Sequence, residues 1–346
     1  MTILIATWNL EHADRLISQN LSDNILERRH RIRETIKRIS PDILCIQEGP
    51  RGEQAIVDFC SQVLDDQWHP VLLRQPGEDL GFRDKEYQLK GTQWIWFLVK
   101  TDLRTKCRLQ SPLVWQAFIS GKTWKVNYWG IEKSSRHSHY RHPQVLIMDI
   151  GDNQEIEFIG VHLKSKINRK KIILDEEDNL IGDFVTTALT ARIKLAIEAH
   201  NIREYIEAKF MQLEHPGIVV MGDCNDGPGQ DLFENQYLFF DLISNLQGEV
   251  IIAERFFNHA LFDYSGELRW TAKYRDAIKK ISAEDNPLLL DHILISQPLC
   301  QGNLSFMVNE QAGRVEHEEF ERNNVGSNSK TRTSDHRPVS CKFNPT

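Results

Sequence analysis

Short apolar runs recur along the whole chain and constrain its fold more than any other feature. Each run is four to eight residues long, and most are rich in Ile, Val or Phe, as buried β-strands are. The sequence predicts strands at Ile3–Thr7, Ile43–Gln47, Ile95–Val99, Val145–Ile150, Ile156–Val161, Ile218–Met221, Leu288–Ile295 and Val339–Phe343. Strands of this kind need helices or a second sheet to cover their faces.

Two helices are readable between these strands. Ser22 or Asp23 is suited to cap the first, and Pro41 ends it. The second carries one continuous apolar stripe, suited to covering a sheet, formed by Phe184, Ala188, Ala191, Leu195, Ala199, Ile202 and Ile206. A strongly basic face of the first helix is predicted to meet solvent, through Arg28, Arg29, Arg31, Arg33, Lys37 and Arg38. The order of elements favours mixed sheets with outer helices.

The chain is expected to fold as a single domain over residues 1–346. No linker of Gly, Ser or Pro divides it, and no internal repeat is visible. Long loops are predicted at about 61–90, 101–141, 164–183 and 227–287. The N-terminus runs directly into a strand without a basic leader, and no window approaches ~18 consecutive apolar residues. We therefore expect a soluble cytoplasmic protein with no membrane segment.

Composition excludes several classes of protein. With 40% apolar and 26% charged residues the chain is not disordered. A formal net charge of −7 gives no general attraction to nucleic acid, although carboxylates of a metal site would add negative charge that bound cations offset. Six scattered cysteines indicate neither a disulfide framework nor a zinc site.

Polar residues with catalytic chemistry lie at the ends of the predicted strands. Asn9, Glu48, His162, Asp223 and Asn225 follow strands, and Asp335 and His336 immediately precede the last one. Taken singly, an Asp or Asn at a strand end is more often a turn or cap residue. Asp291 differs, because a carboxylate inside a run of leucines is costly to bury unless a cation, a metal or a histidine pairs with it.

Phosphodiester cleavage needs residues of these types. A hard cation held by oxygen ligands neutralises the phosphoryl oxygens, and a carboxylate orients or deprotonates the attacking water. Neutral or cationic donors stabilise the charge of the transition state. The residues at the strand ends supply all three parts.

These motifs resemble the endonuclease/exonuclease/phosphatase superfamily, whose members include deoxyribonuclease-I-like nucleases. The resemblance spans residues 7 to 339 in the family's order. It rests on Thr7-Trp8-Asn9, Gln47-Glu48, Gly160-Val161-His162-Leu163, Gly222-Asp223-Cys224-Asn225, Asp291-His292 and Ser334-Asp335-His336-Arg337-Pro338. It implies a four-layer α/β sandwich, in which two mixed β-sheets pack face to face between outer helices.

The resemblance also implies a role for each residue. Glu48 would ligate Mg²⁺, with Mn²⁺ as a substitute, and Asn9 and Asp335 would lie beside the ion. Asp223 would orient or deprotonate the water, held by Asn225. The phosphate would be contacted by His336, whose ring Asp291 supports, by His162 as a second donor, and by Arg141.

One position departs from the family pattern. Deoxyribonuclease-I-like enzymes place a glutamate before the strand that matches Ile95–Val99, where it supports the first histidine. This sequence aligns Gln93 there. A neutral amide stabilises a charged imidazole less than a carboxylate does, so either His162 acts as a neutral donor or another residue supports it.

Substrate class stays open between two alternatives. Two basic stretches lie in loops near the predicted site: Lys133, Arg136, His137, His139, Arg141 and His142, then Lys164, Lys166, Arg169, Lys170 and Lys171. They favour nucleic acid as the substrate, with Lys164 and Lys166 as phosphate contacts. The same stretches are equally compatible with solvated charged loops that bind no polymer. The alternative substrate is a small-molecule or lipid-headgroup phosphoester. Intact motifs argue against an inactive binding module, and protein partners are not predicted.

Overall fold

The computed structural model describes residues 1–346 except 1, 19, 123, 129–130, 136–138 and 178, and it does not describe the side chains of 124–128 and 131–135. Sixteen strands appear: β1 Ile3–Asn9, β2 Ile43–Gly49, β3 Trp68–Pro70, β4 Trp94–Lys100, β5 Cys107–Leu109, β6 Trp124–Tyr128, β7 Ile131–Ser135, β8 Gln144–Gly151, β9 Gln154–His162, β10 Gly217–Asp223, β11 Asn258–His259, β12 Ala272–Lys273, β13 Pro287–Leu288, β14 Asp291–Ile295, β15 Phe306–Val315 and β16 Val339–Pro345. All eight predicted strand regions contain strand structure.

The described α-helices are α1 Asp23–Ile39, α2 Glu53–Leu64, α3 Leu113–Ile119, α4 Asp183–Gln212, α5 Leu242–Gln247, α6 Gln297–Cys300 and α7 His317–Asn323. Both predicted helices are confirmed. Within the described residues, none of the helices is long and apolar enough to cross a membrane.

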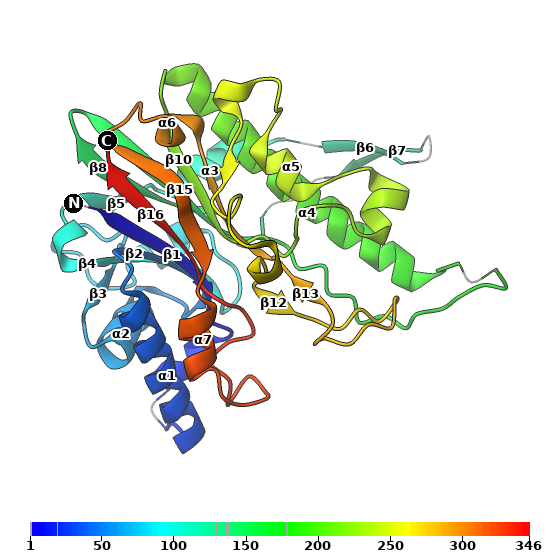
Figure 1. Cartoon of the computed structure of the whole chain (residues 1–346), viewed down its shortest axis with the longest axis horizontal. Coiled ribbons are helices and arrows are strands. Elements are labelled where there is room, and N and C mark those ends of the chain that lie inside the picture. The colour runs from blue at the N-terminus through cyan, green and yellow to red at the C-terminus, as the bar shows by residue number, and fades with distance from the viewer. Residues whose placement is uncertain (1, 19, 123, 129–130, 136–138, 178) are drawn as a thin grey trace.

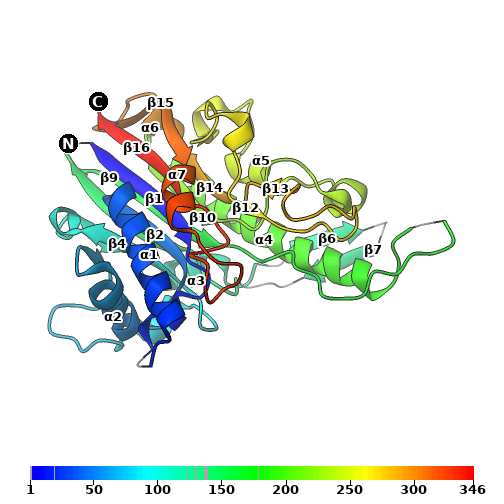
Figure 2. The same cartoon turned by 60° about the horizontal axis from the view of Figure 1, so that its bottom comes forward.

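Two six-stranded sheets form the centre of the molecule, in the orders β15-β16-β1-β2-β4-β3 and β11-β14-β10-β9-β8-β5. They pack face to face through an inner core that includes Ile5, Phe97, Phe158, Met221 and Ile293. Figures 1 and 2 show α1 and α2 on the outer side of the first sheet and α4 and α5 on the outer side of the second. The predicted four-layer α/β sandwich with two mixed sheets is confirmed.

Alternation along the strands explains the layers. In β10, Val219 and Met221 point into the inner core, whereas Ile218 and Val220 pack beneath α4. In β1 the neighbour of inward-facing Ile5 is Ala6, which packs on the helical side. Successive side chains of a strand point to opposite faces, so a strand that is apolar throughout requires cover on both sides.

Strand direction brings the ends of distant segments to one edge. β1 runs parallel to β2 and antiparallel to β16, so the ends of β1 and β2 lie beside the start of β16. β10 likewise runs parallel to β9 and antiparallel to β14. The polar residues at these positions therefore gather at one edge of the sandwich.

Two sequence expectations about element boundaries were wrong. The apolar run Leu288–Ile295 is not one strand, because Pro287–Leu288 pairs with β12 and a separate strand starts at Asp291. Three of the four predicted loops contain short helices and strands, which are too brief for apolar periodicity to reveal. Of the four, only 164–183 remains largely without regular structure before α4 begins.

The sequence predicted that the basic face of α1 meets solvent, but part of this face is buried. Arg28 is fully buried, and its guanidinium donates to the carbonyl oxygens of Leu10, Glu11 and Thr333. These carbonyls belong to the segments that follow β1 and precede β16. Arg28 therefore ties together two chain segments that carry site residues.

Gly222 offers a test of how closely β9 and β10 approach. Its φ is +140°, and an added Cβ would lie 2.1 Å from the carbonyl oxygen of Val161. Gly222→Ala is expected to lower the free energy of unfolding by about 3 kcal/mol, measured by urea denaturation. Gly229→Ala is the matched control, because its φ of +90° is also positive but its Cβ would meet open space. It should lose about 1 kcal/mol, and equal losses would contradict the role of this close approach.

Candidate active site at the seam of the two sheets

Three site residues form one row across the second sheet. Asp223 at the end of β10 is in register with His162 of β9 on one side and with Asp291 of β14 on the other. All three side chains are almost completely buried. His162 Nε2 lies 3.6 Å from Asp223 Oδ2, outside hydrogen-bond distance.

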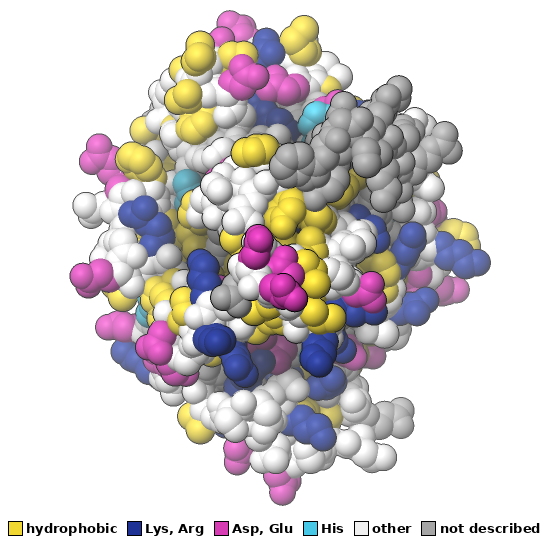
Figure 3. Space-filling model, turned by 90° about the vertical axis from the view of Figure 1, so that its right-hand side faces the viewer, with side chains coloured by type: hydrophobic (Ala, Val, Ile, Leu, Met, Phe, Trp, Pro, Cys, Tyr) yellow, Lys and Arg dark blue, Asp and Glu magenta, His cyan; other side chains and the backbone are white. Residues whose placement is uncertain are grey.

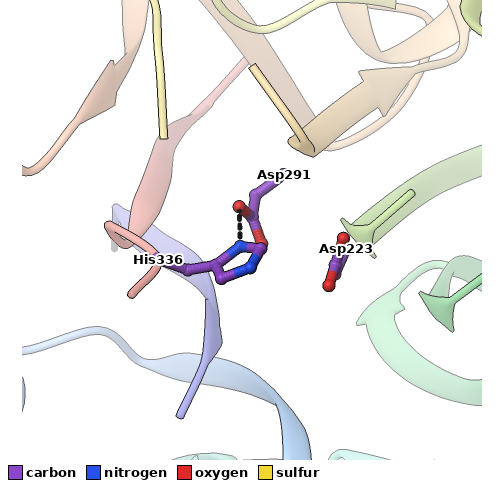
Figure 4. Close-up of side chains that lie close together, drawn as sticks. All are labelled: Asp223, Asp291 and His336. Atoms are coloured by element: carbon purple, nitrogen blue, oxygen red, sulfur yellow. Dashed lines mark hydrogen bonds and ion pairs between the residues drawn. The ribbon is translucent and has the colours of Figure 1, made fainter. Parts of the chain in front are cut away.

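Two side-chain pairs join this row to the first sheet. Asn9 of β1 donates from Nδ2 to Asp223 Oδ2 at 2.9 Å. His336, just before β16, lies with Nδ1 2.7 Å from Asp291 Oδ2. Figure 4 shows Asp291 bonded to the imidazole ring and Asp223 near it. The site is thus built across the seam between the sheets.

The Asp291–His336 pair sets the charge of the imidazole. Burial alone would lower the pKa of His336, but the charges of Asp291 and Asp223 and the hydrogen bond to Asp291 raise it to about 10. The ring is therefore an imidazolium at neutral pH. The sequence predicted that a cation, a metal or a histidine pairs with Asp291, and a histidine does so.

Asp223 is held in a defined orientation. Its Oδ1 accepts the backbone N–H of Asn225 at 2.8 Å, and its Oδ2 accepts Asn9. Asn225 has a left-handed φ of +54°, and its side chain donates to the carbonyl oxygen of Leu163 at 3.0 Å. Burial raises the pKa of Asp223 to about 7, with His336 opposing and Asp291 reinforcing the shift. A carboxylate with such a pKa is suited to accept a proton near neutral pH.

His162 is a neutral imidazole. Burial holds its pKa well below the ordinary range, and the charges of Arg141 and His336 lower it further. Within the described residues, the hydrogen bonds of the Gln93 side chain go to His12, Glu48 and Arg141 and not to His162. The Asp223 carboxylate is too far from His162 for a hydrogen bond, so the neutral-donor alternative fits the structure.

The Gln93 side chain hydrogen-bonds to Glu48 and Arg141. Its Nε2 donates to Glu48 Oε2, and its Oε1 accepts Arg141 Nη2 at 2.7 Å. The backbone N–H of His12 also donates to Glu48 Oε2, at 2.9 Å. Gln93 thus links the predicted cation ligand Glu48 to the predicted phosphate contact Arg141, a role that the sequence did not reveal.

Asp335 lies in a cluster with residues that the sequence analysis missed. Its Oδ2 accepts the Tyr274 hydroxyl at 2.9 Å and Arg332 Nη2 at 3.1 Å. Arg332 also forms a bidentate pair with Glu11 at 2.7 and 2.6 Å. No apolar pattern or known motif marks Tyr274, which lies in a predicted loop.

The donor set fits a hard divalent cation. Hydrogen bonds from the described residues reach Glu48 only at Oε2, so Oε1 is available to a cation. Asp291 Oδ1 is buried without a hydrogen-bond partner among the described residues. Ligand atoms of Asp223, Asp291 and His336 lie within 4.8 Å of one another, but His336 Nδ1 is already bonded to Asp291, which makes this group the weaker candidate site. Oxygen donors and unbalanced negative charge are what Mg²⁺ or Mn²⁺ requires.

Lys166 does not face the predicted site as a free cation. Its ammonium group contacts Asp226, Asp231 at 3.1 Å and Glu234 at 3.1 Å. Lys164 is half-buried and donates from Nζ to the Ser165 carbonyl oxygen at 3.0 Å. Their predicted contacts with substrate stay predictions.

The remaining basic residues do not form a uniform patch. Arg169, Lys170 and Lys171 are exposed after Lys166, whereas Arg136 and His137 lie outside the described residues. On the face shown in Figure 3, Lys and Arg side chains are interspersed with Asp and Glu. Any attraction to a polyanion on this face is therefore local.

Comparison with known proteins supports the fold. No family model and no curated protein matches the sequence. A truncated TDP2 from Caenorhabditis elegans matches 99% of this chain and 97% of its own, with a TM-score of 0.54 and 13% identity. An endonuclease/exonuclease/phosphatase from Bacteroides vulgatus matches 100% of both chains, with a TM-score of 0.50 and 12% identity. The chain therefore has the deoxyribonuclease-I-like fold of these structures.

The charge of His336 can be tested directly. Asp291→Asn removes the carboxylate but keeps an oxygen acceptor, so the fold should be retained while the pKa of His336 falls from about 10 toward its ordinary value or below. Histidine ¹H–¹⁵N spectra of the metal-free protein over a pH series measure this. Asp149→Asn, an exposed change in β8, is the control. An unchanged His336 pKa in the Asp291 variant would contradict the pairing.

Proposed function

We propose that this protein is a divalent-cation-dependent phosphoesterase that cleaves phosphodiester bonds by in-line attack of water, with nucleic acid as its preferred substrate. The observation that carries the proposal is geometric: ligand atoms of His336, an imidazole donor, and of Asp223, a carboxylate, lie within 4.8 Å of each other. The raised pKa values of both groups, about 10 for His336 and about 7 for Asp223, support it. One group donates to phosphoryl oxygen and the other accepts a proton from water. The two are placed across the seam by the Asp291–His336 and Asn9–Asp223 contacts.

Asp223 is the proposed base. Its two carboxylate oxygens are oriented by Asn9 and by the backbone of Asn225, which leaves further lone pairs for a water molecule. A pKa near 7 lets it remove a proton as water attacks phosphorus. Asn225 is also proposed to contact the phosphate, through the side-chain amide that donates to the Leu163 carbonyl oxygen.

The two histidines are the proposed donors. Asp291 occupies His336 Nδ1, so the Nε2–H of the imidazolium is the atom that donates to a phosphoryl oxygen. His162 is neutral and supplies one N–H to the phosphate or to the leaving oxygen. Arg141, whose guanidinium is held by Gln93, is the proposed additional phosphate contact.

The cation is proposed to be Mg²⁺, with Mn²⁺ as a substitute, held by Glu48 with Asn9 and Asp335 beside it. Glu48 and Asp335 have side chains that are 16% and 19% exposed, so an ion can enter. Both ring nitrogens of His336 already have partners, Asp291 on Nδ1 and the Tyr274 hydroxyl on Nε2, which argues against the buried Asp223–Asp291–His336 group as the primary cation site. When bound, the cation neutralises charge on the phosphoryl and leaving oxygens.

Removal of the proposed base should abolish turnover. Asp223→Asn is expected to lower kcat by about 10²- to 10⁴-fold, because the amide cannot accept the proton. The assay is cleavage of a fluorescent oligonucleotide with Mg²⁺. Asp102→Asn, an exposed residue beyond the opposite end of β4, should keep the wild-type rate. A wild-type rate in the Asp223 variant would refute the proposed role of this carboxylate.

Substrate class can be separated by salt dependence. Cleavage of single- and double-stranded DNA and RNA should weaken as salt rises, because phosphate contacts displace counterions. Turnover of a small phosphodiester should depend much less on salt. Absence of cleavage on all four polymers, together with turnover of the small ester, would favour the small-molecule alternative, which the mixed surface charge also allows.

A further inference from the structure

The Tyr274 hydroxyl lies within hydrogen-bond distance of two proposed site residues, Asp335 and His336. Its hydroxyl donates to Asp335 Oδ2 at 2.9 Å and lies 3.1 Å from His336 Nε2. Asp291 is bonded to His336 Nδ1, so Nε2 is the ring nitrogen that faces the tyrosine oxygen. A single hydroxyl therefore lies within hydrogen-bond distance of both the proposed phosphate donor and a proposed cation ligand.

The backbone of Tyr274 is anchored rather than carried on a free loop. Tyr274 follows β12, which pairs with β13, and its carbonyl oxygen accepts Asn286 Nδ2 at 2.7 Å. Ala272 forms a β-bridge with His336, and the backbone N–H of Arg337 donates to the Thr271 carbonyl oxygen at 2.8 Å. The hydroxyl can therefore move only through side-chain rotation, while the residue stays beside the site.

The hydroxyl is also chemically suited to face an anion. A tyrosine hydroxyl carries one O–H donor, which can form a hydrogen bond to an anion. The tyrosine oxygen occupies the acceptor position on Nε2 that a phosphoryl oxygen would take. A phosphate at that position would lie within hydrogen-bond distance of the same hydroxyl.

We propose that Tyr274 is a further catalytic residue, whose hydroxyl turns from Asp335 and donates to the phosphoryl oxygen that His336 Nε2 also contacts. This inference rests on the proposed function. In the free protein the hydroxyl satisfies both charged neighbours. In the complex the phosphoryl oxygen replaces it on His336, and its proton is shared with the phosphate instead of Asp335.

Binding of inorganic phosphate tests the proposal without turnover. Tyr274→Phe should bind phosphate about tenfold more weakly than wild type, with or without Mg²⁺, because one donor to a charged group is lost. Calorimetric titration measures the affinity. Tyr205→Phe is the matched control, since the Tyr205 hydroxyl also donates to a carboxylate, Glu157 Oε2, at 2.9 Å but lies on α4. It should bind phosphate as wild type does.

Turnover gives a second readout. Tyr274→Phe should lower kcat about 10- to 100-fold with a smaller change in KM, because the bond strengthens as charge develops on the phosphoryl oxygen. The His336 pKa should stay raised, since Asp291 remains. A folded variant with wild-type phosphate affinity and kcat would overturn the proposal.

Other results are equally decisive. Tighter phosphate binding and faster turnover in Tyr274→Phe would also overturn the proposal, because they would make the hydroxyl a competitor for Nε2. A loss of the same size in Tyr205→Phe would show a general effect of removing a buried hydroxyl. If wild-type protein cleaves no phosphoester at all, the proposed function fails, whereas the phosphate titration still decides whether Tyr274 contacts the anion.

Discussion

The buried hydrogen bond between Asp291 and His336 is the interaction on which the site depends. Asp291 begins a strand of one sheet and His336 precedes a strand of the other, so the pair joins the two halves of the sandwich at the edge where the strand ends meet. Deleting one of the two side chains would leave an uncompensated buried charge, which is strongly destabilising, whereas Asp291→Asn keeps an acceptor for the ring. The same pair makes the imidazole a cation and therefore a donor.

The hydrogen bond between Asn9 and Asp223 is the second contact across the seam. Asn9 holds Asp223 from the first sheet, while register within the second sheet places Asp223 between His162 and Asp291. Burial keeps His162 neutral and raises the pKa of Asp223 to about 7. The charges of Asp291 and Asp223 outweigh burial at His336 and raise its pKa to about 10. The proposed acid and base roles thus follow from position.

Much of this arrangement was predictable from the sequence. Apolar runs marked the strands, and the polar residues at their ends marked the site, because strand ends gather at one edge of a sheet. A carboxylate among leucines required a partner, and His336 supplies it. Contacts set by tertiary geometry were not predictable: the burial of Arg28, the link from Gln93 to Glu48, and the position of Tyr274 each depend on segments far apart in sequence.

The central claim is that water attacks phosphorus directly at this seam. A single-turnover reaction in ¹⁸O-labelled water, with Mg²⁺ and excess protein, tests it most directly through mass spectrometry of the separated products. The account predicts one ¹⁸O atom in the product phosphate and none in the released alcohol. Label in the alcohol oxygen, or an unlabelled phosphate, would show that water does not attack phosphorus and would contradict the account.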